Sequence, residues 1–282
     1  MNIKEAINKA IIKLKTNKIG SPNLKARILM QFVLDKPRQY VLVRDYEEME
    51  NKTIDEYIKA VDKLCKNVPI EHITNMKEFM KMNFYVDENV LIPRQDTEIL
   101  VEEIIDIAKR VNAFKILDLC TGSGAIAVSL AKYIPNADIT AVDISDKALN
   151  IAKLNAKKNG VSDNITFVLS DMFENICKEK YDIIVSNPPY IKTSVCKHLD
   201  EQVKKEPILA LDGGDDGLNF YKTIISKGYE YLKYNGYICL EIGYDQKIDV
   251  IELMENSGQY INIYSKQDLY QNDRIVVGKV GD

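Results

Sequence analysis

Residues 116–125 read Ile-Leu-Asp-Leu-Cys-Thr-Gly-Ser-Gly-Ala, a short apolar run that leads directly into a loop with two glycines. The run is typical of a strand buried in a sheet. Gly122 and Gly124 permit a tight turn, and the apolar residues that follow predict a helix from Gly124 onward. The stretch therefore predicts the strand–loop–helix unit from which parallel α/β sheets are built.

Strands and helices alternate on both sides of this stretch. Continuously apolar segments such as Ile183-Ile184-Val185 are expected of a parallel sheet that is covered on both faces. The pattern predicts a doubly wound α/β domain, whose ligands bind at the carboxyl ends of the strands. The expected strands are 114–119, 139–142, 165–169, 181–186, 237–242 and an antiparallel pair at 260–264 and 274–280; the expected helices are 97–110 after an N-cap at Asp96, 146–159 before Gly160, and 220–232.

The first 67 residues have the apolar spacing of helices. Ser21-Pro22 is a helix start signal, and Thr53 and Glu56 have the spacing of a capping box. Between Pro69 and Pro93, apolar pairs near 79 and 84–86 predict a short hairpin, with turn residues at 87–89. The expected domains are a helical bundle at 1–70, a β-hairpin linker at 71–93 and the α/β domain at 94–282.

Composition excludes several classes of protein. The 282 residues are 46% hydrophobic and 28% charged, with a net charge of −4, as in an ordinary globular protein. The first 70 residues carry 14 Lys/Arg against 9 Asp/Glu, which leaves 24 Lys/Arg against 33 Asp/Glu for the rest of the chain. The α/β part is therefore acidic, which disfavours electrostatic binding of nucleic acid. The basic segment could face an acidic or RNA-rich partner, but a solvated helix surface is the favoured explanation.

Cysteine and histidine usage argues against a metal site. Five widely spaced cysteines and two histidines give neither metal-ligand spacing nor a disulfide framework. The first residues lack the apolar core of a signal peptide, and no run is long enough to span a bilayer. The expected location is the cytoplasm, without a membrane partner.

Acidic residues lie at the ends of three successive strands. Asp143 is placed to accept hydrogen bonds from both hydroxyls of a ribose, and Asp171 with Met172 is suited to the edge and face of an adenine. The glycine loop lets a ligand lie against backbone N–H groups. Together with Asp118, these positions predict a nucleoside site.

The identity of the nucleoside depends on charge. Gly122-x-Gly124-x-x-Ala127 followed by Asp143 also satisfies the dinucleotide fingerprint, so NAD is an alternative. Asp118, directly before the glycines, would repel a pyrophosphate but could pair with the cationic tail of an amino acid. S-adenosylmethionine carries such a tail and no phosphate, so the sequence favours the methyl donor.

The expected acceptor site is Asn187-Pro188-Pro189-Tyr190, at the end of the fourth strand. The side-chain oxygen of Asn187 and the carbonyl of Pro188 can accept both protons of an NH2 group, while the prolines fix the backbone and Tyr190 can stack on the planar group. Holding both protons turns the nitrogen lone pair towards the methyl group and stabilises the charge that develops on nitrogen. A sulfonium is a good leaving group, so no strong general base is required. The tetrapeptide predicts methyl transfer to an amide or aromatic amine nitrogen.

Several motifs together carry a resemblance to a known family. They are Pro-Ile-Glu-His-Ile-Thr at 69–74, Val-Leu-Ile-Pro-Arg-Gln-Asp-Thr-Glu at 90–98, the loop at 118–124, the segment 186–190, Leu-Asp-Gly-Gly-Asp-Asp-Gly-Leu at 211–218, and Asp-Arg at 273–274. In these the chain resembles the HemK/PrmC family, the methyltransferases that modify the glutamine of the Gly-Gly-Gln motif in peptide chain release factors. The resemblance implies a class I S-adenosylmethionine-dependent methyltransferase fold, Rossmann-like with a seven-stranded mostly parallel sheet, and a small N-terminal helical bundle that engages the release factor.

The resemblance also implies which residues form the site. Asn187, Pro188, Pro189 and Tyr190 would hold the glutamine, and the cofactor would be held by Asp118, Cys120, Thr121, Gly122, Ser123, Gly124, Asp143, Asp171, Met172 and Asn187. Two positions depart from the family pattern: Cys120 stands where glycine is usual, which disfavours left-handed geometry, and Met172 stands where an aromatic residue is common.

Other motif residues have two interpretations or a structural one. Arg94, Thr97 and Glu98 border the active site in this family, but helix capping and an ion pair explain them equally well. The glycine loop at 213–217 reads as a turn, since its aspartates would repel phosphate, and Arg274 reads as structural.

Three alternatives remain at this stage. A glutamine of a ribosomal protein would need the same acceptor clamp. A DNA adenine methyltransferase shares the Asn-Pro-Pro-Tyr element but needs a basic target-recognition region, which the sequence lacks. An NAD-dependent oxidoreductase or a non-catalytic nucleotide-binding module would share only the glycine loop.

Overall fold

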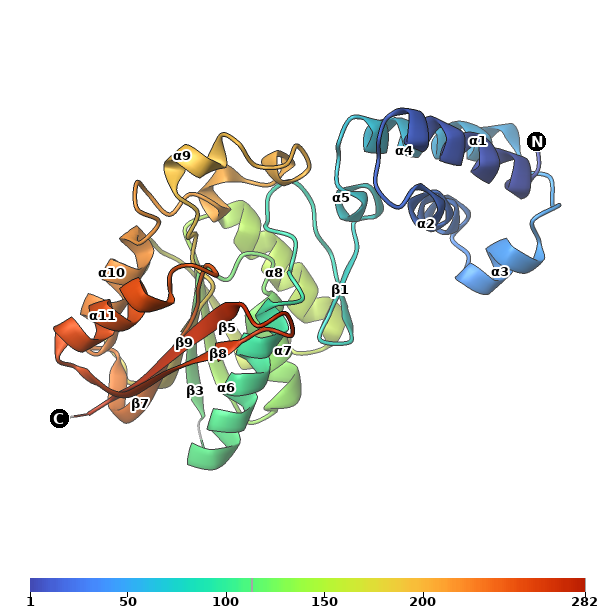
Figure 1. Ribbon diagram of the computed structural model, residues 1–282. Coiled ribbons are helices and arrows are strands. Elements are labelled where there is room, and N and C mark those ends of the chain that lie inside the picture. Colours follow the sequence, from blue (N-terminus) through green and yellow to red (C-terminus); the bar gives the residue numbers. More distant parts are fainter. Residues whose placement is uncertain (113, 282) are drawn as a thin grey trace. The chain divides into compact units, whose positions relative to one another are not determined.

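The computed structural model describes residues 1–112 and 114–281, which divide into two compact units (Figure 1). The smaller unit holds Met1–Met76 and Asp200–Lys205, and the larger unit holds the remaining described residues. The structure thus groups the segment from Lys77 onward with the larger unit. The expected domain limits at 70 and 93 stay a prediction.

The smaller unit is helical. Its apolar faces meet in one core that includes Leu14, Leu29 and Leu64, and the hydroxyl of Tyr57 donates a hydrogen bond to the carbonyl of Ala26 at 3.0 Å. This buried hydrogen bond joins two helices that are distant in sequence. The helices are α1 (Ile3–Thr16), α2 (Pro22–Leu34), α3 (Arg38–Val43), α4 (Asn51–Cys65) and α5 (Ile70–Thr74).

Two of the expected helix caps are absent from this unit. Helix α2 begins at Pro22 as expected, but Ser21 has a left-handed backbone with φ of 52° and its side chain makes no capping hydrogen bond. The prediction of a capping box at Thr53 and Glu56 is wrong, because α4 already begins at Asn51 and Thr53 lies inside its first turn. A capping box forms instead at the start of α1, from Asn2 and Glu5.

The larger unit is built on a seven-stranded sheet with the order β5-β4-β3-β6-β7-β9-β8. Neighbouring strands from β5 to β7 are parallel, and β9 is antiparallel to both β7 and β8. The expected seven-stranded, mostly parallel sheet is confirmed. The strands are β3 (Lys115–Leu119), β4 (Asp138–Asp143), β5 (Ile165–Leu169), β6 (Tyr181–Ser186), β7 (Leu232–Glu241), β8 (Tyr260–Gln267) and β9 (Asp273–Val280).

Helices cover both faces of this sheet (Figure 1). On one face α6 (Thr97–Val111), α7 (Ala125–Tyr133) and α8 (Asp146–Asn159) contribute to one apolar cluster, and on the other α10 (Asn219–Gly228) and α11 (Lys247–Ser257) contribute to a second. The short helix α9 (Thr193–Cys196) and 3-10 turns at Ser162–Asn164, Val203–Lys205 and Ile208–Ala210 complete the described elements. None of the described helices has both the length and the apolar content needed to cross a bilayer.

Several local expectations need correction. The hairpin pairs β1 (Lys77–Phe79) with β2 (Met82–Phe84), and Met80 and Lys81 form its turn with φ of 48° and 59°. The expected helix at 220–232 ends at Gly228, because Leu232 already belongs to β7 and pairs with the first residue of β6. Asp96 precedes α6 but makes no side-chain cap, and α11 was not predicted from the sequence.

Candidate functional site

The carboxyl ends of β3, β4 and β6 lie side by side. Leu119 is the register partner of both Val142 and Ser186, so the loops after these strands leave the sheet at one edge. The hydroxyl of Ser186 donates to the carbonyl of Leu119 at 2.7 Å and ties the two strand ends together. The parallel topology thus brings the glycine loop and the Asn-Pro-Pro-Tyr segment to the same place.

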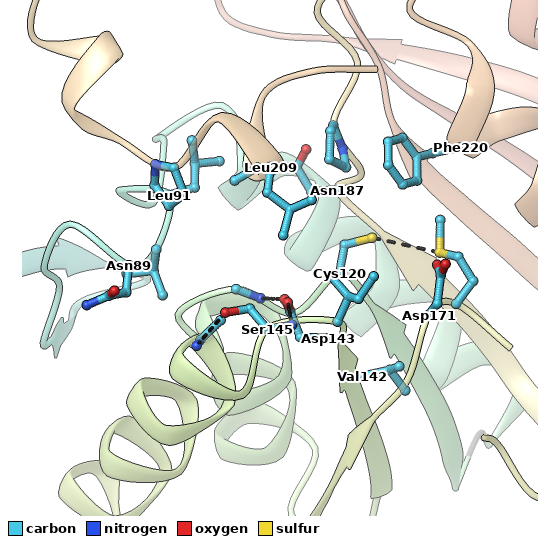
Figure 2. A pocket seen from close by; sticks show the side chains of 18 of the residues that line it. Asn89, Leu91, Cys120, Val142, Asp143, Ser145, Asp171, Asn187, Leu209 and Phe220 are labelled. Carbon is cyan, nitrogen blue, oxygen red and sulfur yellow. Dashed lines mark hydrogen bonds between the residues drawn. The ribbon is translucent and has the colours of Figure 1, made fainter. Parts of the chain in front are cut away.

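A cavity of about 340 Å³ opens at this edge. Figure 2 shows Asp143 and Asp171 on one side of it, Asn187 and Leu209 on the other, and Cys120 between them. The volume is within the range of small-molecule sites. The lining residues are Asn89, Val90, Leu91, Cys120, Gly122, Val142, Asp143, Ile144, Ser145, Ala148, Ser170, Asp171, Met172, Asn187, Pro189, Pro207, Leu209, Ala210 and Phe220.

The loop after β3 has the left-handed geometry that the glycine signal predicted. Gly122 has φ of 56°, and a side chain there would point into open space, with only the carbonyl of Cys120 at 4.0 Å. Cys120 itself has φ of 62°, so the cysteine adopts the conformation that the sequence disfavoured. Its thiol lies 3.9 Å from the sulfur of Met172, and the two side chains form an apolar patch on the cavity wall (Figure 2).

Asp143 is held in one orientation by the backbone. Its Oδ2 accepts a hydrogen bond from the N–H of Gly122 at 2.8 Å, and its Oδ1 accepts one from the N–H of Ser145 at 2.9 Å. Burial raises the pKa of this carboxyl, and the backbone donors oppose the shift. The backbone N–H of Ile144 also favours the ionised form. Because two carboxylate oxygens can together accept four hydrogen bonds, the carboxylate keeps acceptor capacity for a ligand in the cavity.

Asp118 has a different place from the one expected. It lies one residue before the end of β3, is fully buried and lines neither this cavity nor the smaller one beside it. Its Oδ2 accepts a hydrogen bond from the Thr121 hydroxyl at 2.6 Å, and burial raises its pKa to about 7. Asp118 therefore does not reach the cavity surface, where it would pair with an amino-acid tail. Its side chain instead holds the loop through Thr121.

The remaining loop residues divide between the two cavities. Thr121 and Ser123 line the smaller cavity, of about 50 Å³, which shares Leu91, Cys120, Gly122 and Asn187 with the larger one. Gly124 lines neither, and a side chain there would meet Ala152 of α8 at 2.9 Å. Gly124 therefore allows close packing of α7 on α8.

Asn187 lies where the two cavities meet. Its Nδ2 donates a hydrogen bond to the Oγ1 of Thr97 at 3.3 Å, and Thr97 is buried in the first turn of α6. The carboxyl of Glu241, the last residue of β7, lies against the same two side chains. Burial raises its pKa to about 7, although hydrogen bonding to Thr97, the charge of Arg274 and hydrogen bonding to Asn187 oppose the shift.

The backbone after Asn187 is supported by a second glycine loop. A side chain on Gly213 would lie 2.7 Å from the Cα of Tyr190 and 2.8 Å from the carbonyl oxygen of Pro189, so only glycine allows this contact. The side chain of Gln246 donates to the carbonyls of Tyr190 and Gly217 at 3.0 and 3.2 Å. The loop at 213–217 therefore acts as a support for the Asn-Pro-Pro-Tyr backbone, in addition to being the expected turn.

Pro188 and Tyr190 do not line the described cavities. Pro188 is buried, and Tyr190 packs against the apolar cluster beneath α10 and α11, where burial raises the pKa of its hydroxyl. Pro189 does line the larger cavity. The expected stacking of Tyr190 on a substrate amide stays a prediction.

Glu98, Arg94 and Arg274 each make separate hydrogen bonds or ion pairs. Glu98 accepts a hydrogen bond from the backbone of Met80 in the hairpin turn, at 2.7 Å. Arg94 lines the smaller cavity and pairs with buried Glu206 at 2.6 Å. Arg274 pairs with Asp268 at 2.9 Å and Asp96 at 3.3 Å, in agreement with its structural interpretation.

The residues that line the cavity suit the chemistry of S-adenosylmethionine. They offer a carboxylate with acceptor capacity at Asp143, an exposed carboxylate at Asp171, and apolar walls that include Val142 and Met172. The open space beside Gly122 would let a ligand lie close to the backbone of the loop. These are the groups that a nucleoside with an attached amino acid would require.

Three functional candidates were not predicted in these roles. Thr97 and Glu241 lie beside Asn187, although they are 90 and 54 residues away from it in sequence. Gln246 supports the backbone at Tyr190, which is 56 residues away in sequence. The segment Leu240-Glu241-Ile242-Gly243 carried the signal for Glu241, since it places an acid at a fourth strand end.

The chain is similar to known methyltransferases over its whole length. The family models "PrmC N-terminal domain" and "Methyltransferase small domain" match residues 5–74 and 94–205. The chain is 38% identical to a release factor glutamine methyltransferase of Clostridium acetobutylicum, over 100% of this chain and 99% of the relative. It is 36% identical to one of Moorella thermoacetica, over 97% of each.

A solved structure resembles the chain in fold alone. A methyltransferase from Pyrococcus furiosus aligns with a TM-score of 0.53 at 16% identity, over 73% of this chain and 92% of that one. The expected class I methyltransferase fold is confirmed.

Proposed function

This chain belongs to the release factor glutamine methyltransferases, and we propose that it transfers a methyl group from S-adenosylmethionine to the side-chain amide nitrogen, N5, of the glutamine in the Gly-Gly-Gln motif of peptide chain release factors. One observation carries the proposal at the level of atoms. Asn187, an acceptor for an amide, lines the same cavity as Asp143 and Met172, the residues suited to the nucleoside. Donor and acceptor groups thus have access to one enclosed space.

On the donor side, Asp143 would hold the ribose hydroxyls, and Met172 and Val142 would contact the adenine. The loop from Cys120 to Gly124 would lie along the amino-acid tail, which can approach closely where Gly122 has no side chain. When bound, the cofactor supplies an electrophilic methyl group on a sulfonium. With the cofactor in place, the apolar walls would limit the access of water to this centre, which would strengthen the electrostatic interactions inside the cavity.

On the acceptor side, the chain's task is to orient a feeble nucleophile. The side-chain oxygen of Asn187 would accept one proton of the substrate NH2, and the carbonyl of Pro188 would accept the other. The support of this backbone by Gly213 and Gln246 keeps both acceptors in place before the substrate arrives. Because the acceptors bear partial negative charge, they stabilise the positive charge that develops on the attacking nitrogen.

Recognition of the protein partner is proposed for the smaller unit. The family model of the PrmC N-terminal domain matches residues 5–74, which are net basic. Since release factors act in translation, the proposed location is the cytoplasm. Membrane partners and direct sequence-specific contacts with nucleic acid are not part of the proposal.

A labelling assay tests the function. The purified chain is incubated with S-adenosylmethionine labelled on its methyl group and with a full-length release factor, or with the same factor carrying glutamate in place of the motif glutamine. The proposal predicts label on the first protein and none on the second. Label on ribosomal proteins only, or on both release factor variants, would contradict it.

A further inference from the structure

We propose that Glu241 is a positioning residue for methyl transfer, which acts together with Thr97 to orient the side-chain amide of Asn187. The inference rests on the proposed function, since it assigns a task to the amide that holds the substrate. Glu241 ends β7, and Leu240 is the register partner of Ser186, so Glu241 and Asn187 leave neighbouring strands at the same level. The hydroxyl of Tyr221 donates to the carbonyl of Glu241 at 2.9 Å and fixes its backbone.

The hydrogen bonds in this cluster have a direction. The Nδ2 of Asn187 donates to the Oγ1 of Thr97, so the single proton of the Thr97 hydroxyl is free to be donated onward. The carboxyl of Glu241 lies beside that hydroxyl. An ionised carboxylate only accepts hydrogen bonds, so Glu241 can accept from the Thr97 hydroxyl and from the NH2 of Asn187, and both contacts hold that NH2 on the side of Thr97 and Glu241.

This arrangement leaves the Oδ1 of Asn187 as the acceptor for the substrate. If Glu241 were protonated it could donate to Thr97, the Thr97 hydroxyl could then donate to Asn187, and the amide could turn with its NH2 towards the cavity. An NH2 group there would oppose the NH2 of a glutamine. The negative charge of Glu241 is therefore what selects the productive orientation.

The burial of Glu241 indicates a specific role. The residue is 1% exposed, and its Oε2 atom is buried without a hydrogen-bond partner among the described residues. An unpaired buried carboxylate oxygen costs stability, so the position would not favour an acid for packing alone.

The charged and titratable groups around Glu241 come from four elements. Arg274 of β9 favours its ionised form, Asp96 before α6 opposes it, and the hydroxyls of Tyr190 and Tyr221 face it from the segment after β6 and from α10. Burial is the largest influence and moves its titration to near neutral pH. The kcat for methyl transfer should therefore be highest above this pH range and should decrease as the pH falls through it.

The test compares Glu241→Gln with a control that removes a buried carboxylate elsewhere in the same unit. The control is Glu103→Gln in α6, where Glu103 is 3% exposed and pairs with Lys266 and Arg110. For each protein, kcat on a release factor is measured between about pH 5.5 and 8.5. The affinity for S-adenosylmethionine is measured by calorimetry.

The wild type and the control should lose about tenfold in kcat per pH unit below an apparent pKa near 7. Glu241→Gln should lose at least about tenfold at high pH, the factor expected for one misplaced hydrogen bond, and should lack the acidic limb. Its cofactor affinity should stay within about twofold, because the change affects the acceptor side only. Retention of the wild-type profile, or equal loss in the control, would overturn the proposal.

Two further measurements keep the result decisive. If Glu241→Gln does not fold, Thr97→Val, which keeps the shape and removes the hydroxyl, should show the same loss of the acidic limb; an unchanged limb would overturn the proposal. The side-chain 15N amide signals of Asn187, identified by their loss in Asn187→Ala, should shift with pH in the wild type near Glu241's titration. If the wild type methylates no release factor, the proposed function fails but the positioning role does not. An Asn187 amide signal that does not change with pH would refute the positioning role separately.

Discussion

Gly213→Ala offers a sharp test of how the acceptor segment is held. The new Cβ would lie 2.7 Å from the Cα of Tyr190 and 2.8 Å from the carbonyl oxygen of Pro189, where ordinary contact begins at 3.4 Å. Both neighbours are backbone atoms, so the Asn-Pro-Pro-Tyr segment must move by roughly 0.7 Å or the glycine loop must withdraw. Gly213 does not need a left-handed φ, so the contact alone causes the effect.

The displacement sets the expected magnitude. Overpacking of this kind costs about 1–3 kcal/mol of stability. A misplacement near 1 Å in a reacting group costs about a hundredfold in rate, so kcat should fall by about 10- to 100-fold. The affinity for S-adenosylmethionine should change by less than about twofold, since the loop from Cys120 to Gly124 is not displaced.

The matched control is Gly236→Ala, at the opposite end of the sheet. Its Cβ would lie 2.9 Å from the carbonyl oxygen of Lys233 and 3.1 Å from that of Asp182, again without a left-handed φ. The control should lose similar stability in thermal unfolding but keep its kcat. Steady-state kinetics and calorimetry on both variants decide the matter. A folded Gly213→Ala variant with wild-type kcat, or an equal loss of kcat in Gly236→Ala, would show that the Gly213 contact does not position the acceptor segment.

Three other substitutions separate the roles within the site. Asn187→Ala should lower kcat by about 10²–10³ and leave the cofactor Kd within about twofold, as read by rate assays and calorimetry; a weakened Kd with normal kcat would reverse the assigned roles. Asp143→Ala should chiefly weaken cofactor binding, by about 1–3 kcal/mol for the loss of charge-assisted hydrogen bonds, and an unchanged Kd would contradict this. Asp118→Asn tests a pKa that burial raises from 3.8 to about 7. Because the folded wild type then holds a proton that the unfolded chain releases, its stability falls as the pH rises from about 4 to 7, by up to about 1.4 kcal/mol per pKa unit. The stability of Asp118→Asn relative to wild type should therefore increase over that range in urea unfolding, and a difference independent of pH would exclude the raised pKa.

The sequence predicted those elements whose signals are local. Helix α8 runs from Asp146 to Asn159 and ends at Gly160, as expected, because a glycine terminates it in left-handed geometry. Strands β5 and β6 also have the expected limits, since their apolar runs are bounded on both sides by polar residues. Such signals depend only on neighbours along the chain.

Features that depend on packing were harder to predict. The start of β7 at Leu232 follows from pairing with β6, and the helical pattern before it continues without a break. Helix α11 has buried residues at Val250 and Met254 but an exposed Ile248, so its apolar face is poorly marked. In both cases tertiary contacts decide what the local pattern leaves ambiguous.

The site residues also differ in whether local sequence signals or tertiary packing determine their positions. The loop at 120–124, Asp143 and Asn187 follow strands, and the parallel topology brings them together as expected. The sequence predicts Asp118 as an acid at a strand end, but the residue lies within β3 and its side chain is fully buried beneath the loop. Glu241 was missed because only the strand order places β7 beside β6 and hence its carboxyl beside Asn187.

In the proposed reaction, Asn187 presents a neutral amide nitrogen of the partner protein to the methyl donor. Tandem mass spectrometry of the Gly-Gly-Gln peptide, recovered from a full-length release factor after reaction, tests it most directly. We expect one added methyl group on the glutamine side chain with the wild-type enzyme and none with Asn187→Ala. A methyl group on another residue, or equal methylation by the Asn187→Ala variant, would contradict it.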